Sequence, residues 1–160
     1  MPELVLPTVA VRDSFLAGER DACAADGTDS SWLDSVEADF GAYVAQCRRV
    51  RRQWDVPVSS FWLVSGPEYY GALTIRHELT PELRHDGGHV GYLVVPARRR
   101  RGHATGMLAG ACAICRGQGM TELLVTCNEG NTGSQRVIEA NGGVLDTATD
   151  GIRRYWIRLR

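Results

Sequence analysis

The spacing of apolar residues predicts helices in the first third of the chain. Between Leu33 and Val50, apolar residues recur every three or four positions, which places them on one face of a helix. A looser repeat of the same kind predicts a helix over about 9–25. The short run Leu4–Leu6 is typical of an edge strand. We therefore expect two helices before the chain becomes extended.

The apolar period changes after Pro57. Compact apolar runs bounded by turn residues then follow one another, which is typical of strands. These runs are Phe61 to Val64, Tyr70 to Arg76 and His89 to Val95. The segment from His77 to Leu83 leaves the second strand and is expected to form a helical turn. The pattern predicts an antiparallel meander.

The last third alternates between helical and extended patterns. It predicts a helix over about 102–116 and a buried strand from Glu122 to Cys127. The capping-box pattern Thr132-x-x-Gln135 predicts the start of a short helix. Two strands around a turn at 149–151 close the chain.

These elements together predict an α/β fold (α+β, with a mixed sheet). An antiparallel meander is followed by a parallel β-α-β unit, which should be right-handed, and helices lie on both faces. A length of 160 residues fits a single domain over 1–160.

The basic residues are all of one kind: the 18 cationic side chains are Arg, and Lys is absent. Reactions that need a lysine, such as P-loop phosphate binding or a pyridoxal Schiff base, are therefore excluded. A net charge of −1 gives no general attraction to nucleic acid or to an anionic membrane. We expect neither as a partner.

The cysteine pattern favours reduced thiols. There are five cysteines, an odd number, and no signal-peptide pattern opens the sequence, so we expect a cytoplasmic protein. Cys112-x-x-Cys115 lies in an apolar helical pattern and has no second pair to complete a zinc site. We interpret it as helix packing and expect no metal.

The stretch from Pro96 to Thr105 carries the clearest candidate chemistry. A strand ends at Pro96 and a helix begins near Gly102. The first N–H groups of a helix are unpaired and favour an anion. Gly102 and Ala104 keep side-chain bulk away from those groups, and Arg99 to Arg101 add bidentate donors. The stretch predicts a phosphate-binding turn.

Arg99-x-x-Gly102-x-Ala104 resembles the Arg/Gln-x-x-Gly-x-Gly/Ala motif of the GNAT superfamily, the acyl-CoA-dependent N-acyltransferases. In that superfamily the motif also follows a meander and opens a helix. The block from Asn131 to Gly142 is similar to the family's Asn-x-x-Ala-x-x-Leu-Tyr-Glu-x-x-Gly-Phe block. Arg76 to Leu79 and Gly87 to Tyr92 resemble a bacterial subgroup of predicted acetyltransferases. The resemblance covers about residues 58–158.

The resemblance implies how acetyl-CoA is held. Pantetheine is expected in a gap between splayed strands, and the pyrophosphate on the amides of the turn. The helix after Asn131 is expected to face pantetheine. The implied cofactor-binding residues are Leu93, Val94, Val95, Arg99, Arg100, Arg101, Gly102, His103, Ala104, Thr105, Asn131 and Ser134.

The resemblance also implies direct attack of an amine on the thioester, which needs an acid for the leaving thiolate. Ile138 stands where the family often has a tyrosine, and it cannot donate a proton. Tyr155 is the candidate substitute, Ser134 and Cys127 are weaker options, and unassisted departure of the thiolate stays open.

The same reaction needs a base to deprotonate the ammonium. Glu78 and His89 are the candidates, and the pKa of an ordinary histidine suits this task. His77 and His103 are further options, although His103 belongs to the phosphate-turn motif.

The leading hypothesis is an acetyl-CoA-dependent N-acetyltransferase that acts on a primary amine of a small molecule or peptide. A non-catalytic acyl-CoA sensor on the same fold is one alternative. A nucleic-acid-binding protein that uses its arginine clusters is another. The sequence leaves the acceptor and the assembly, including a homodimer, open.

Overall fold

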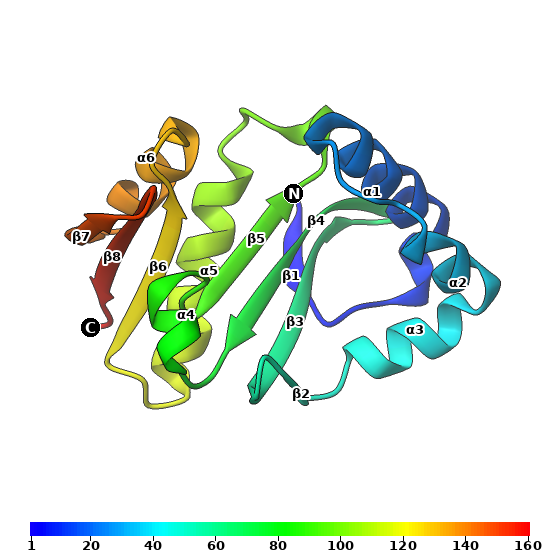
Figure 1. Cartoon of the computed structure of the whole chain (residues 1–160). Helices are drawn as coiled ribbons and strands as arrows, with labels where there is room; N and C mark the ends of the chain where they lie inside the picture. The colour runs from blue at the N-terminus through cyan, green and yellow to red at the C-terminus, as the bar shows by residue number, and fades with distance from the viewer.

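The computed structural model describes all 160 residues, which form two antiparallel sheets with helices around them (Figure 1). The strands are β1 (Glu3–Val5), β2 (Arg51–Gln53), β3 (Val56–Ser65), β4 (Glu68–Arg76), β5 (Val90–Val94), β6 (Glu122–Asn128), β7 (Val144–Thr149) and β8 (Ile152–Arg158). The helices are α1 (Arg12–Asp26), α2 (Trp32–Ala38), α3 (Phe40–Cys47), α4 (Pro81–His85), α5 (His103–Gly117) and α6 (Thr132–Ala140), with short 3-10 turns at Val9–Val11 and Pro96–Arg98.

The first sheet has the order β1-β3-β4-β5, with β2 paired to the end of β3. It contains the predicted meander, and α1 to α3 cover one side of it (Figure 1). Aromatic packing joins these layers: Phe15 of α1 stacks on Trp62 of β3 at 4.6 Å between ring centroids, and Tyr69 of β4 meets Phe15 edge-on. This cluster fixes α1 above β4.

The second sheet has the order β6-β8-β7. The helix α5 links the two sheets, because its buried face packs against residues of both. Met107, Leu108 and Cys115 belong to one core cluster with Leu73 of β4 and Val125 of β6. Cys112 packs against the same cluster, so the Cys112-x-x-Cys115 pair is part of helix packing.

The strands β5 and β6 run in the same direction around α5 but form no ladder (Figure 1). Backbone hydrogen bonding joins them just before β5 begins. The His89 N–H donates to the Leu124 carbonyl oxygen at 2.8 Å, and the Leu124 N–H donates to His89 Nδ1 at 2.9 Å. Gly88 has φ of 61°, and a Cβ there would collide with the Leu124 carbonyl oxygen. Beyond this junction the two strands diverge.

Two predicted helix starts differ from the structure. The single helix expected between Leu33 and Val50 is broken at Asp39, whose carboxylate accepts the Ala42 N–H and caps α3. The apolar spacing continues across the break and hides it. The short helix α6 is capped by Asn131 rather than by a Thr132 capping box, since Asn131 Oδ1 accepts the Ser134 N–H at 3.0 Å.

Candidate active site

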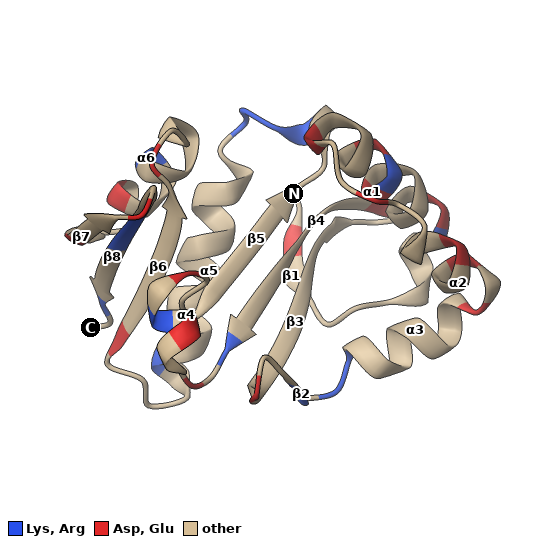
Figure 2. Cartoon of the chain, in the orientation of Figure 1, with Lys and Arg blue, Asp and Glu red and all other residues tan.

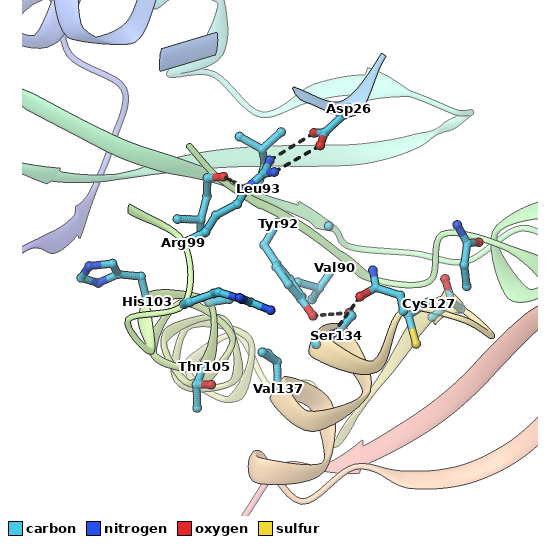
Figure 3. A pocket seen from close by; sticks show the side chains of 18 of the residues that line it. Asp26, Val90, Tyr92, Leu93, Arg99, His103, Thr105, Cys127, Ser134 and Val137 are labelled. Carbon is cyan, nitrogen blue, oxygen red and sulfur yellow. Dashed lines mark hydrogen bonds and ion pairs between the residues drawn. The ribbon is translucent and has the colours of Figure 1, made fainter. Parts of the chain in front are cut away.

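A cleft of about 790 Å³ lies between the diverging strands β5 and β6. Residues from both sheets, from the start of α5, from α6 and from the end of α1 line it (Figure 3). Figure 2 shows basic residues on the β5–α5 connection, at one end of this cleft.

The start of α5 presents free backbone donors to the cleft. Gly102 adopts φ of 83° at the N-cap, and no side chain caps the helix. The first hydrogen bond into the helix is from the Gly106 N–H to the Gly102 carbonyl, so the N–H groups of residues 103 to 105 have no acceptor. Nothing lies within 4 Å of a Cβ built at Gly102. An anion can therefore approach these amides directly.

Two of the arginines at this end, Arg98 and Arg99, are occupied by the protein. Arg99 donates from Nε to the Val94 carbonyl at 2.8 Å, and its Nη1 and Nη2 reach the Asp26 carboxylate at 3.2 and 3.1 Å. Arg98 stacks over Tyr70, with 4.3 Å from Cζ to the ring centroid, and lies 3.9 Å from Glu68. The Arg99 guanidinium thus fastens the end of α1 to the turn.

The residues expected to bind the cofactor divide into two groups. Those that line the cleft are Leu93, Val94, Arg99, Arg100, Gly102, His103, Ala104, Thr105, Asn131 and Ser134. Val95 and Arg101 do not line it. Val95 is buried in the core under α1, and Arg101 is exposed.

Two hydroxyl groups that line the cleft form a hydrogen bond between β5 and α6. The Tyr92 hydroxyl on β5 lies 2.7 Å from Ser134 Oγ on α6, and both residues line the cleft (Figure 3). Burial raises the pKa of Tyr92, although the hydrogen bond with Ser134 works against this. The phenol therefore carries its proton at neutral pH. The sequence did not single out Tyr92 as a site residue. Strand alternation does, however, place Tyr92 on the opposite face of the strand from the candidate His89.

None of the three catalytic candidates lines this cleft. His89 is buried at the junction with its Nδ1 occupied, and burial, together with the charges of Arg84, Arg76 and His77, lowers its pKa to about 4. Glu78 is exposed beyond the end of β4. Tyr155 is buried in the core, and its hydroxyl has no hydrogen-bond partner. The structure does not bring these three side chains together.

The end of the cleft away from the α5 turn is polar and includes residues that the sequence did not single out as site residues. Arg76, Asp86 and Thr126 line it. Arg76 Nη1 donates to the carbonyls of Gly87 and Gly88 at 2.9 and 3.3 Å, and the Gly87 N–H donates to Thr126 Oγ1 at 2.9 Å. These bonds hold the loop before β5 against β6.

The structure contains no group of three or more His, Cys, Asp or Glu side chains placed to hold a metal ion. None of its helices combines the length and the apolar character that crossing a membrane requires.

The diverging strands, with free helix amides at one end of the gap, fit the acyl-CoA site that the family resemblance implied. The comparison with protein families agrees: the acetyltransferase (GNAT) domain family matches residues 31–144. The chain belongs to this family and is an acetyltransferase.

Solved structures show the same fold at low sequence identity. RimL, a ribosomal L7/L12 alpha-N-protein acetyltransferase in complex with coenzyme A, has a TM-score of 0.71 and 14% identity over 99% of this chain and 94% of its own. The microcin C7 self-immunity acetyltransferase MccE, in complex with acetyl-CoA and AMP, has a TM-score of 0.68 and 12% identity over 97% of this chain and 91% of its own.

A third structure, the GNAT domain of S. lividans PAT, has a TM-score of 0.65 and 16% identity over 99% of this chain and 90% of its own. No curated protein matches the chain in sequence.

Proposed function

We propose that the chain is one acetyltransferase domain that transfers an acetyl group from acetyl-CoA to a primary amine of a small molecule or peptide. The amine attacks directly in a ternary complex. The observation that carries this proposal is one continuous cleft. It runs from the free amides of α5, past the Tyr92–Ser134 pair, to the polar end at Arg76 and Asp86.

The residues at the α5 end fit the phosphates of coenzyme A. A pyrophosphate needs several donors and room for close approach, and Gly102 leaves the amides of residues 103 to 105 open. Arg100 lines the same end and forms no ion pair, so it is free to add a charge-assisted bond. Acetyl-CoA would supply the acetyl thioester.

The cleft also offers groups for the two proton transfers. Tyr92 and Ser134 carry protons on a hydrogen-bonded pair, and we propose this pair as the acid for the departing thiolate. Asp86 is the carboxylate at the far end, and we propose it as the base for the acceptor ammonium. The other cleft carboxylate, Asp26, is occupied by Arg99. Glu78, His89 and Tyr155 lie outside the cleft and are not proposed for contact with the substrate.

Five free cysteines support the cytoplasm as the compartment in this proposal.

The test has two stages. Saturating acetyl-CoA should raise the melting temperature, because a ligand that binds only the native state stabilises it. Thiol release should then follow addition of at least one member of a broad amine panel. Absence of any thermal shift, together with absence of binding heat, would overturn the proposal. Binding without thiol release from any amine would instead support an acyl-CoA sensor.

A further inference from the structure

Arg76 lies on the face of the first sheet opposite to α5. Its neighbours Leu73 and Ile75 on β4 belong to the core that packs on α5. Because side chains alternate along a strand, Thr74 and Arg76 face the other way. The phosphate-binding amides belong to α5, so coenzyme A is expected from the α5 side. The side that Arg76 faces is then left for the acceptor.

Arg76 is a partly buried cation without a carboxylate partner. It takes part in no ion pair, and its two hydrogen bonds, to the carbonyls of Gly87 and Gly88, both come from Nη1. Its Nε is buried and has no acceptor. Burial lowers the pKa of Arg76, against the opposing charge of Asp86. The bonds that hold the loop before β5 use only Nη1 of Arg76. The Nε and Nη2 donors have no acceptor within the protein.

An exposed aromatic side chain holds this cation in place. The Arg76 guanidinium lies over the Trp54 ring, with 4.5 Å from Cζ to the ring centroid. Trp54 stands in the turn between β2 and β3 with φ of 53°, followed by Asp55 with φ of 62°. Positive φ at both central residues is the geometry of a two-residue hairpin turn, so the turn itself accounts for the backbone of Trp54 and Asp55. Half of Trp54 is exposed (50%), so burial does not explain its position.

The neighbouring strand leaves the free side of the guanidinium open. Gly91 on β5 lines the cleft, and a Cβ at this position would lie 3.3 Å from Arg76 Nη2. The backbone of Gly91 does not have positive φ, so the conformation there does not require glycine. Glycine at this position keeps Nη2 accessible from the cleft.

We infer that Arg76, stacked on Trp54, binds an oxyanion of the acceptor, a carboxylate or a phosphate. The inference rests on the proposed function and narrows its substrate to amines that also carry an anionic group. Asp86 lines the same end of the cleft and suits the ammonium of such an acceptor. An α-amino acid or an amino phosphate therefore fits this end, whereas a simple alkylamine leaves the guanidinium unpaired.

Matched acceptor pairs test the inference. The full-length enzyme with acetyl-CoA is given amino acids against their amides, and phosphoethanolamine against ethanolamine, and thiol release is measured. The anionic member should have a kcat/KM on the order of 10- to 100-fold higher, the range for a charge-assisted hydrogen bond. Comparison of the amino-acid pair with the phosphoethanolamine pair identifies whether the enzyme prefers a carboxylate or a phosphate. Equal or higher kcat/KM for the neutral members would overturn the inference.

Variants separate recognition from loop support. Arg76→Gln should remove most of the preference for the anionic member of each pair. Gly91→Ala leaves the bonds to Gly87 and Gly88 in place and should reduce the same preference several-fold. Arg49→Gln is the matched control, because Arg49 is exposed and its side chain makes no hydrogen bond or ion pair. A purely structural role predicts equal losses for both members and an unchanged ratio.

A binding measurement keeps the inference testable without turnover. N-acetylglycine and its neutral amide are titrated into the coenzyme A complex, and Trp fluorescence is compared with that of the Trp54→Phe variant. A saturable response to the acid alone, lost in Trp54→Phe and Arg76→Gln, is expected. No response to the acid, together with no preference for phosphoethanolamine over ethanolamine while coenzyme A itself binds, would contradict the inference but not the proposed function. Failure of coenzyme A to bind would contradict the proposed function first.

Discussion

The two ends of the cleft hold their arginines in opposite ways. At the α5 turn, Arg99 is paired with Asp26 and Arg98 lies near Glu68, so the free donors are the backbone N–H groups, with Arg100 beside them. At the other end Arg76 has no carboxylate partner, and carbonyls and an aromatic ring hold it. One end offers backbone dipoles, and the other offers a side-chain charge.

This difference bears on how each end selects its ligand. Backbone amides at a helix start recognise a phosphate by shape and dipole, and one glycine conformation controls access to them. A guanidinium recognises any oxyanion that can reach it. The first arrangement suits a cofactor that never changes, and the second suits an acceptor defined by its charge.

The largest effect on acetyl-CoA binding is expected from blocking the free N–H groups at the start of α5. Gly102→Val places a β-branched residue at φ of 83° and covers the free N–H groups. We expect acetyl-CoA affinity to fall on the order of 100-fold, measured by calorimetry, since the lost amide bonds to a charged phosphate reach about 3 kcal/mol. Arg98→Gln, whose guanidinium already lies on Tyr70, should cost much less. Equal losses would mean that the arginines, not the amides, hold the phosphates.

The acid pair lies between the two ends. Tyr92→Phe removes the phenolic proton but keeps the ring, so kcat should fall roughly 10- to 100-fold while acetyl-CoA affinity stays within about twofold. Ser134→Ala should have a similar effect, and the double variant should add little because the two hydroxyls form one pair. A Tyr92→Phe enzyme with full kcat would remove Tyr92 from the proposed mechanism.

The stability of the His89–Leu124 junction, which joins the two sheets, should depend on pH. The pKa of His89 is lowered from 6.5 to about 4, so its contribution to stability is complete above 6.5 and is lost as pH falls towards 4. We expect a loss of about 2 kcal/mol, after discounting for solvent, in urea unfolding across this window. His89→Asn keeps an acceptor for the Leu124 N–H without a titration in this range and should flatten the curve.

Glu19 provides the matched control for this measurement. Burial raises its pKa from 4.5 to about 6, so its contribution is present below 4.5 and is lost as pH rises through 6, the opposite sign to His89. Glu19→Gln should therefore make the acid-side loss of stability steeper. A His89→Asn protein with the pH dependence of the parent would contradict the role of the junction.

The smallest effect is expected from freeing Arg99. Asp26→Asn removes the carboxylate that occupies its guanidinium, and about two fifths of each side chain is exposed (36% and 42%). Such a pair contributes roughly 0.2–1 kcal/mol, so acetyl-CoA affinity should rise by no more than about fivefold. A fall in affinity would show that Asp26 orients Arg99 for the phosphates instead of competing with them.

The elements were predictable where one local signal decides them. The meander, the buried strand β6 and the helix α5 follow from apolar period and turn residues. The break at Asp39 was not predictable, because the apolar spacing of α2 continues into α3 and the cap is a single polar residue. The Asn131 cap was missed for the same reason, since an overlapping pattern begins one residue later.

The candidate site was predictable in one half only. The free amides at Gly102 follow from a contiguous strand, turn and helix. The Tyr92–Ser134 pair joins residues 42 positions apart, and the Arg76–Trp54 contact depends on how the β2–β3 turn lies beside β4. Such side-chain contacts across the fold leave no periodic trace in the sequence.

The pair of hydrogen bonds between His89 and Leu124 has a consequence for folding. Residues 35 positions apart meet there, and the loop between them contains the whole of α5. Closing a loop of this length has an entropic cost, which the packing of α5 against both sheets helps to offset. The gap that receives the cofactor therefore ends where the two sheets are coupled, and hydrogen exchange at Leu124 should report how cooperatively they unfold.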